Sequence, residues 1–308
     1  MKKLRFTGVV LSIVALSIVI LQAVCSVAQT APARPRITGI DHVSFYTTAP
    51  DGMKKLYSDV LGLASAPAVE TGESGRYLVG MQWVGYSAAP DPKVNDRLDH
   101  VAFVTDNIAA LRRYLTANGV KVGQIEGRSD HSLSFSLTDP EGHHVEFVER
   151  GKADLMTPPP AAVSKHMIHA GFLVYHREAE DHFYRDLLGF HLYWQGGIQP
   201  DRIEWASMQV PDGTDWLEYM LNQPEHADLR TTGVMNHISL GVADIKKAQA
   251  MLESHGWKMH DNEKAQMGKD GKWQLNLYDP DLTRVELMEF KPVEKPCCSE
   301  FTGTHPSE

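Results

Sequence analysis

The sequence predicts an α+β protein in which one strand–helix–strands unit occurs four times, as two domains of two units each. Three observations carry this prediction. A strand bearing a histidine recurs four times, a helical stretch ending at a glycine follows it each time, and the second and fourth copies close on an Asp-Pro turn and a strand bearing a glutamate. A chain of 308 residues is long enough for two domains of about 100–150 residues each.

The histidine-bearing strands are recognised by their alternation with a period of two. Their apolar residues lie opposite the histidine and are expected to pack under the helices. On the histidine's own face, the residue two positions further on is small in every copy, which predicts a cavity beside each imidazole. The strands cover residues 41–45, 99–103, 168–172 and 236–240, with His42, His100, His169 and His237 followed by Ser44, Ala102, Gly171 and Ser239.

The helical stretch after each strand has recognisable ends. Asp106 and Asp244 are predicted to cap the start of two helices. A glycine lies nineteen or twenty residues after each histidine, where a helix ends in a left-handed turn; these are Gly62, Gly119, Gly189 and Gly256. The second and fourth copies then close with residues 139–147 and 279–287, in which Glu146 and Glu286 follow the Asp-Pro turn.

Pairing the copies gives a first domain at residues 37–150 and a second at 166–291. The segment 151–165 contains consecutive prolines and is predicted to be an extended linker. Residues 292–308 are predicted to form a polar, solvent-exposed tail. Its Cys297 and Cys298 are adjacent and cannot cross-link distant parts of a core, so apolar packing must hold the fold and neither cysteine is expected to have a redox role.

The first 28 residues are predicted to be a secretory signal peptide, because basic residues at positions 2–5 precede an apolar run and a small-residue motif ends at Ala28. The mature protein is then expected to be periplasmic or secreted and free of the membrane. An uncleaved run that anchors the protein in the bilayer is the alternative. A net charge of −9 makes nucleic acid an unexpected partner.

Four candidate metal ligands fall in the second domain: His169, Glu218, His237 and Glu286. Both glutamates are flanked by apolar, strand-forming residues, and burial of a carboxylate is costly unless it is paired or bound to a metal. The alternative is that these glutamates lie on an exposed edge or pair with a neighbour such as Arg284. Two imidazoles and two carboxylates suit one divalent ion (Zn, Ni, Fe or Mn) with one or two positions left for water or substrate.

The first domain offers a smaller set: His42, His100 and Glu146. Gly85 stands where the second domain has Glu218, within otherwise similar stretches at residues 83–86 and 216–219. Two histidines and one carboxylate suit the open facial site that holds non-haem Fe(II). A decayed metal site that persists for structure is the alternative.

The four histidine strands, the helix end at residues 183–190 and the two Asp-Pro closures resemble the vicinal oxygen chelate superfamily, which includes glyoxalase I, methylmalonyl-CoA epimerase, fosfomycin resistance proteins and extradiol dioxygenases. The resemblance implies that each domain is a pair of βαβββ modules whose sheets curl into a half-barrel cup around a metal. It implies a lyase or isomerase whose metal acts as a Lewis acid on a small molecule with two adjacent oxygens. The glyoxalase-like ligand set maps onto His169, Glu218, His237 and Glu286, with Glu218 or Glu286 as the catalytic base.

An extradiol Fe(II) dioxygenase is the first alternative function. Such enzymes add an acid–base histidine and a tyrosine shortly before the final glutamate. In the first domain His131 is present, but Ser136 stands at the tyrosine position, and the second domain has Lys272 and Trp273 in the corresponding stretch. Both departures weaken the ring-cleavage hypothesis.

A protein that binds a small ligand without a metal, as bleomycin-binding relatives do, is the second alternative. Its ligand would stack on tryptophans, although these also suit a core or an interface: Trp83, Trp194, Trp205 and Trp216. The expected partner is in every case a small molecule. Export argues against cytosolic thiol adducts as substrates, and a monomer or a homodimer is expected.

Overall fold

The computed structural model describes residues 32–151, 161–199, 201–259 and 264–308. The predicted signal peptide at residues 1–28 and most of the predicted linker lie outside the described residues. None of the helices in these described ranges is long and apolar enough to cross a membrane.

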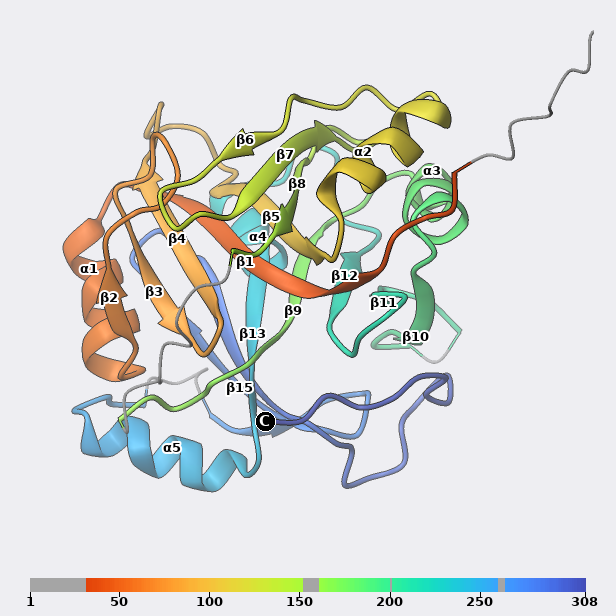
Figure 1. The fold of residues 1–308 in the computed structure, drawn as a ribbon. Coiled ribbons are helices and arrows are strands. Elements are labelled where there is room, and N and C mark those ends of the chain that lie inside the picture. The colour runs from red at the N-terminus through yellow and green to blue at the C-terminus, as the bar shows by residue number, and fades with distance from the viewer. Residues whose placement is uncertain (1–31, 152–160, 200, 260–263) are drawn as a thin grey trace, which may run out of the picture. The chain divides into compact units, whose positions relative to one another are not determined.

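Each domain contains two successive units of one strand, one helix and three strands (Figure 1). The first domain comprises β1 (Ile37–Thr47), α1 (Pro50–Lys54), the π-helical segment η1 (Lys55–Val60), β2 (Ala64–Ala66), β3 (Gly75–Val79) and β4 (Gln82–Ala88), then β5 (Leu98–Thr105), α2 (Ile108–Ala117), β6 (Glu126–Gly127), β7 (Leu133–Thr138) and β8 (His144–Glu149). The second comprises β9 (Met167–Leu173), α3 (Arg177–Glu180), the π-helical segment η2 (Asp181–Leu187), β10 (His191–Gly196), β11 (Trp205–Gln209) and β12 (Trp216–Met220), then α4 (Leu229–Met235), β13 (His237–Val242), α5 (Ile245–Ser254), β14 (Gln266–Met267), β15 (Trp273–Tyr278) and β16 (Arg284–Glu289).

The two sheets have the same topology. The strand order is β2-β3-β4-β1-β5-β8-β7-β6 in the first and β10-β11-β12-β9-β13-β16-β15-β14 in the second. In both, the two histidine-bearing strands pair antiparallel at the centre, and each pairs in parallel with the last strand of its own unit. The predicted α+β class, with four βαβββ modules forming two half-barrel cups, is confirmed.

The apolar face of the histidine-bearing strands forms the core, as their alternation predicted. Val43 and Phe45, one and three residues after His42, are buried. Ile238 and Leu240, at the same distances after His237, are buried as well. These side chains belong to one continuous cluster of buried apolar residues that draws on both domains. The opposite face of the same strands is therefore free to carry polar groups.

The helix ends agree with the sequence in all but one position. The four predicted glycines adopt positive φ angles between 69° and 87°; they are Gly62, Gly119, Gly189 and Gly256. Asp244 caps α5 as predicted, because its side chain accepts hydrogen bonds from two backbone N–H groups. Helix α2 is capped by Asn107 instead of Asp106, and the prediction for Asp106 is wrong by one residue. Asp and Asn cap equally well, so the local sequence did not discriminate between them.

Part of the tail after β16 packs against the second domain, whereas other tail residues, such as Val293, Glu294 and Lys295, are exposed as predicted. Phe301 packs on Tyr193, with ring centres 4.8 Å apart, and the backbone N–H of Thr302 donates to the Tyr193 carbonyl. The indole of Trp194 donates to the carbonyl of Cys297. Cys297 and Cys298 form a disulfide with each other, which closes no loop between distant parts of the chain.

Buried polar groups join the two domains. The amide of Gln82, at the start of β4, donates to the carbonyls of Ile40 and Met167 and accepts from the backbone N–H of Met167 at 2.7 Å. Asp215 of the second domain accepts from the backbone N–H of Ile40 at 2.8 Å. These bonds satisfy strand-edge groups that the junction removes from water.

We expect Gln82→Ala to lower the free energy of unfolding by about 1–3 kcal/mol, because it leaves buried backbone groups of β1 and β9 without a partner. Chemical denaturation measures the effect. Gln249→Ala, at a partly exposed position of α5, is the control and is expected to change stability by less than about 0.5 kcal/mol. Equal stabilities of the two variants would contradict a bridging role for Gln82.

Candidate metal centres

Antiparallel pairing of the histidine-bearing strands brings their imidazoles together in pairs. The Nε2 atoms of His169 and His237 are 3.0 Å apart in the second domain, and those of His42 and His100 are 2.8 Å apart in the first. Three of these four side chains are completely buried, and His100 is mostly so. Histidines that are 58 or 68 residues apart in sequence therefore share one location in each cup.

The small residues near the histidines make room for the imidazole of the partner unit. His237 lies across from Gly171, and His169 lies across from Ser239. A Cβ atom at position 171 would overlap the His237 ring. The space predicted beside each imidazole is thus filled by the second imidazole of the pair, because antiparallel strands place each histidine opposite its neighbour's small residue.

Both glutamates predicted in the second domain face the histidine pair. Glu286 Oε2 lies 3.4 Å from His169 Nε2, and Glu218 Oε2 lies 3.8 Å from that atom and 3.6 Å from His237 Nε2. Parallel pairing places them, since Glu218 lies next to Gly171 and Glu286 next to Ser239 in the sheet. Ligand atoms of His169, His237 and Glu286 thus lie within 4.8 Å of one another, and Glu218 faces the two histidines from outside this group.

This donor set fits one divalent ion. Two nitrogen ligands at right angles on an ion with bonds of about 2.1 Å are about 3.0 Å apart, and this is the separation of the two Nε2 atoms. His237 donates its Nδ1–H to the Met235 carbonyl at 2.7 Å, which leaves the Nε2 lone pair for a metal. Oε2 of Glu286 is buried and has no hydrogen-bond partner among the described residues.

Burial keeps the second-domain imidazoles neutral. It lowers the pKa of both His169 and His237 well below the usual value, and the nearby Arg284 guanidinium acts in the same direction. Burial and the Glu286 carboxylate raise the pKa of Glu218 to about 8. Neutral imidazole is the form that binds metals. Arg284 donates to His237 Nε2 at 2.7 Å, so its guanidinium must move away when an ion binds that nitrogen.

A cavity of 370 Å³ borders the second-domain cluster. Three acidic residues line it, Glu218, Asp270 and Glu286, together with three basic residues, Lys269, Lys272 and Arg284. Lys272 is fully buried, with its Nζ 4.6 Å from the centre of the Trp216 ring, and burial lowers its pKa to about 8. The walls are aromatic; they comprise Tyr193, Trp194, Trp205, Trp216 and Phe301. These walls suit a small, flat or apolar molecule.

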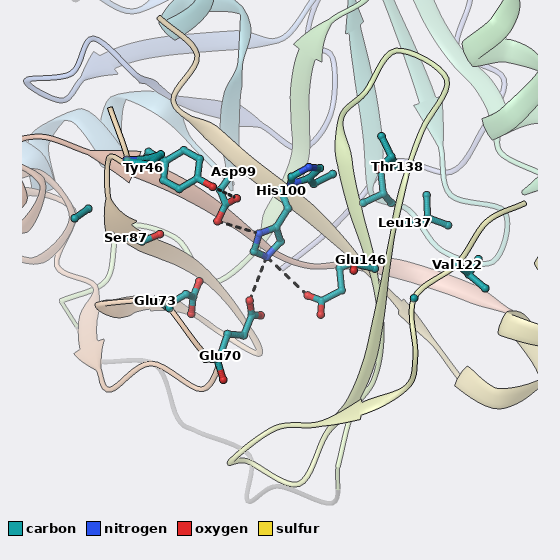
Figure 2. Close-up of a pocket in the computed structure, with 18 of the residues that line it drawn as sticks. Tyr46, Glu70, Glu73, Ser87, Asp99, His100, Val122, Leu137, Thr138 and Glu146 are labelled. Carbon is teal, nitrogen blue, oxygen red and sulfur yellow. Dashed lines mark hydrogen bonds and ion pairs between the residues drawn. The ribbon is translucent and has the colours of Figure 1, made fainter. Parts of the chain in front are cut away.

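The first-domain cluster has four members, one more than the sequence predicted. The carboxylate of Glu70 lies 2.8 Å from His42 Nε2 and 3.4 Å from His100 Nε2. Glu146 lies 3.6 Å and 3.8 Å from the same two nitrogens. Figure 2 shows His100 pointing toward the carboxylates of Glu70 and Glu146, with Asp99 on the other side of its ring.

Glu70 was not predicted from the sequence because it lies in the loop between β2 and β3, and strand periodicity does not identify ligands in a loop. Gly85 does stand at the position of Glu218, and the space above it is taken by the Glu73 carboxylate, which accepts a hydrogen bond from Ser44. The sequence did hold one indication of a further ligand. Two glutamates, Glu70 and Glu73, lie close together in the domain in which Gly85 replaces the strand glutamate.

An arginine balances the charge of the first-domain carboxylates. Arg128 is almost fully buried and pairs with Glu70 at 2.5 Å and with Glu146. Burial opposes protonation of His100, but the carboxylates of Asp99 and Glu70 outweigh it and raise the pKa of His100 to about 10. A protonated imidazole must lose its proton before it binds a metal. The carboxylates of the first cup are thus closely paired with an arginine, whereas in the second cup Arg284, the neighbour that the sequence offered as an alternative partner, lies at the longer distance of 3.9 Å from Glu286.

The larger cavity lies in the first domain, with a volume of 810 Å³. Four carboxylates line it, from Glu70, Glu73, Asp99 and Glu146, and Lys121 is its one basic lining residue apart from histidines. Size alone favours this cup as the active site. The neutral imidazoles favour the second cup, whose cavity has as many basic as acidic lining residues, and we give them more weight because metal binding depends on the protonation state of the ligands.

The residues that pointed to a ring-cleaving dioxygenase are not assembled in the first domain. His131 is exposed in the turn before β7 and has a positive φ of 66°. Ser136 lines the first-domain cavity at the position where the tyrosine is expected. Trp83 stacks on the His42 ring, with centres 4.4 Å apart, so this tryptophan supports a ligand candidate instead of lining the cavity.

Comparison with known families and structures agrees with this architecture. The family model described as the Glyoxalase/Bleomycin resistance protein/Dioxygenase superfamily matches residues 39–147 and 166–287. The chain belongs to this superfamily, and the resemblance noted in the sequence is confirmed. No curated protein sequence matches the chain significantly.

Similar solved structures include homoprotocatechuate 2,3-dioxygenases and a glyoxalase. The enzyme of Brevibacterium fuscum, in complex with 3,4-dihydroxyphenylacetate, has a TM-score of 0.61 at 14% identity, covering 84% of this chain and 82% of that one. The Arthrobacter globiformis enzyme has a TM-score of 0.63 at 14% identity, with the same coverage. The Mn(II)-bound glyoxalase of Novosphingobium aromaticivorans has a TM-score of 0.62 at 16% identity, covering 87% of this chain and 86% of that one. At these identities the likeness shows the fold.

We expect Gly171→Ala to weaken divalent-ion binding in the second domain by about 10–100-fold, because the added methyl group displaces the His237 imidazole. Isothermal titration of the metal-free protein with Mn(II) or Zn(II) measures the effect. Gly127→Ala is the matched control, since a Cβ there meets no atom within 4 Å. Unchanged binding in Gly171→Ala would remove His237 from the ligand set.

Proposed function

We propose that this protein is a metal-dependent lyase or isomerase whose active site is the second-domain cup. The observation that carries the proposal is the cluster of His169, His237 and Glu286, with both imidazoles neutral and Glu218 facing them, beside a cavity that Lys272 and Arg284 line. The substrate class is a small anion with two adjacent oxygens, such as an α-oxo or α-hydroxy acid. Membership of a superfamily that contains metal-dependent enzymes supports this proposal.

A divalent ion held by these four side chains supplies Lewis acidity, which makes a C–H next to a chelated oxygen more acidic. The cup's own residues then move the proton. Glu218 lines the cavity and is slightly exposed, whereas Glu286 is almost fully buried. We therefore assign the role of general base to Glu218, with Glu286 as a fixed ligand and the second choice for that role.

Lys272 and Arg284 are proposed to bind the substrate's negative charge. Both line the cavity, and Lys272 is held among Tyr193, Trp216 and Phe301, which keep water away from its ammonium group. Charges interact more strongly in such a dry environment than in water. When an ion displaces Arg284 from His237, the guanidinium remains beside the cavity and is available to a carboxylate.

The first cup is proposed to serve the structure of the tandem pair, with metal binding there weaker than in the second cup. Its carboxylates are already paired with Arg128, and its four acidic lining residues repel an anionic substrate. We also propose that the protein is exported, on the strength of the signal-like residues 1–28. Zn, Ni, Fe and Mn all remain candidates for the ion, since the neighbours include a Mn(II)-bound glyoxalase.

We expect Glu218→Gln to lower kcat for proton exchange by about 10²–10⁴-fold, because the amide cannot accept the substrate proton. NMR measures this proton abstraction as deuterium exchange at the carbon next to the carbonyl, over a panel of α-oxo and α-hydroxy acids. Ion content, measured by mass spectrometry, is expected to stay above half of the unmodified value because three ligands remain.

Glu178→Gln, at an exposed position of α3, is the matched control and is expected to keep full activity. Full metal-dependent exchange in Glu218→Gln would show that this carboxylate is not the base. A parallel loss in Glu286→Gln alone would transfer the role to Glu286.

An extradiol Fe(II) dioxygenase is the second candidate function. The aromatic walls of the second-domain cavity favour it, and the Brevibacterium fuscum enzyme of similar fold is known in complex with 3,4-dihydroxyphenylacetate. Gly271 corresponds to His131 in the repeat, and Lys272, the next residue, is the polar group that such a reaction would have to use.

We expect no oxygen uptake on catechols after anaerobic reconstitution with Fe(II), because His131 is exposed and Ser136 stands where the tyrosine of a ring-cleaving enzyme is expected. An oxygen electrode measures uptake, and the same sample loaded with Mn(II) is the control. Uptake that Lys272→Met abolishes would replace the lyase proposal with ring cleavage. Ligand binding that is unchanged by a chelator would instead favour a metal-independent binding protein.

A further inference from the structure

A third group of metal-binding side chains lies outside both cups. Asp139 and His143 belong to the turn between β7 and β8 of the first domain, and Glu180 ends α3 of the second domain. One ligand atom from each lies within 4.8 Å of the others. The group therefore joins residues of both domains at one location.

The carboxylate of Glu180 has no compensating positive charge. The residue is completely buried, and one carboxylate oxygen accepts a hydrogen bond from the backbone N–H of Glu141 at 3.1 Å. The other oxygen, Oε2, is buried and has no hydrogen-bond partner among the described residues. In the described ranges, no Arg or Lys forms an ion pair with Asp139, Glu141 or Glu180. Such a group is costly to bury unless something neutralises it.

Asp139 and His143 are already arranged as adjacent ligands. His143 Nδ1 lies 2.8 Å from Asp139 Oδ2, and the hydroxyl of Tyr184 donates to the same oxygen at 3.1 Å. The imidazole is held by stacking on Phe172, with ring centres 4.0 Å apart. A separation of 2.8 Å is close to the value of about 3.0 Å for two ligands at right angles on one ion.

The internal repeat shows that the fold does not need a carboxylate at this position. Glu180 lies eleven residues after His169, and Met53 lies eleven residues after His42; Met53 is completely buried. Thr283 likewise follows Asp279 by four residues, as His143 follows Asp139. The equivalent location at the other domain contact thus contains Asp279, Thr283 and Met53. Only the aspartate is repeated there, so the histidine and the glutamate occur at one of the two contacts.

We propose that Asp139, His143 and Glu180 bind a divalent cation between the two domains, separate from the ions of the cups. Two carboxylates and one imidazole suit Zn(II), Mn(II), Fe(II) or Co(II). The ion neutralises Glu180 and ties the β7–β8 turn to α3. Its route is a cavity of 530 Å³ that His143 lines, with Asp96, Asp99, Glu141 and Glu225 among the other lining residues, and their negative charge attracts cations.

A proton shared between Glu180 and Asp139 is the competing way to neutralise the group. Burial and the Asp139 and Glu141 carboxylates raise the pKa of Glu180 to about 9. The two accounts predict different effects of zinc on stability. If a proton already neutralises the group, zinc does not bind there at neutral pH and does not stabilise the protein through this site.

The test uses the full chain, stripped with a chelator and reloaded with Zn(II), in unmodified form and as Glu180→Met and His143→Thr. These two changes copy the residues of the equivalent location, and Glu178→Gln on the same helix is the control. We expect each of the two variants to bind one zinc ion fewer per chain than the control, as counted by mass spectrometry. We also expect an anomalous-scattering peak between the three side chains in crystals of the unmodified protein.

Thermal melts separate the cation from the shared proton. Zinc is expected to raise the Tm of the control more than that of Glu180→Gln, which keeps a neutral hydrogen-bonding group but loses a ligand. Equal zinc counts, equal Tm shifts or no anomalous peak would overturn the proposal. The zinc count compares variants whose cups are unchanged. Its result therefore tests this site independently of ion binding and catalysis in the second domain. If Glu180→Met does not fold, His143→Thr and the anomalous map decide.

Discussion

Antiparallel pairing between the two histidine-bearing strands of each domain is the constraint on which both cups depend. It places His237 across from Gly171 and His169 across from Ser239, so two imidazoles meet only because each has a small residue opposite it. Parallel pairing with the closing strands then adds the glutamates to the same face of the sheet. A one-residue shift in the register of a strand would turn the ligand candidate on that strand toward the apolar core.

The two cups share this geometry and differ in how their charges are balanced. In the first, Arg128 pairs with the carboxylates and His100 holds a proton, so the polar cluster is internally neutralised. In the second, the imidazoles are neutral, Arg284 lies 3.9 Å from one oxygen of Glu286, and the other oxygen has no hydrogen-bond partner among the described residues, which suits the divalent ion proposed there. Duplication of one unit therefore produced two similar frameworks with different electrostatic needs.

The contact between the domains follows the same repeat. The turn before β8 reaches the second domain, where the Glu141 carboxylate accepts from the backbone N–H of Tyr175 at 2.9 Å, just before α3. The turn before β16 reaches back to the first domain, where Asp281 accepts from the backbone N–H of Thr48 at 2.8 Å, just before α1. Each domain thus supplies an acidic group to the start of a helix in the other, where the backbone N–H groups lack partners. The buried Glu180 is the feature that breaks this symmetry.

The sequence by itself determined the four units, their alternating faces, the glycines that end the helices and the four ligand candidates of the second domain. It could do so because strand periodicity and helix-stop residues are local, and because each ligand candidate occupies a fixed position in a repeated strand. Only the tertiary structure decided that Glu70 joins the first cup, that Arg128 neutralises it, and that the tail covers Tyr193. These residues lie in loops and a terminus, whose paths follow from packing against distant strands, and no local pattern records where such a path ends.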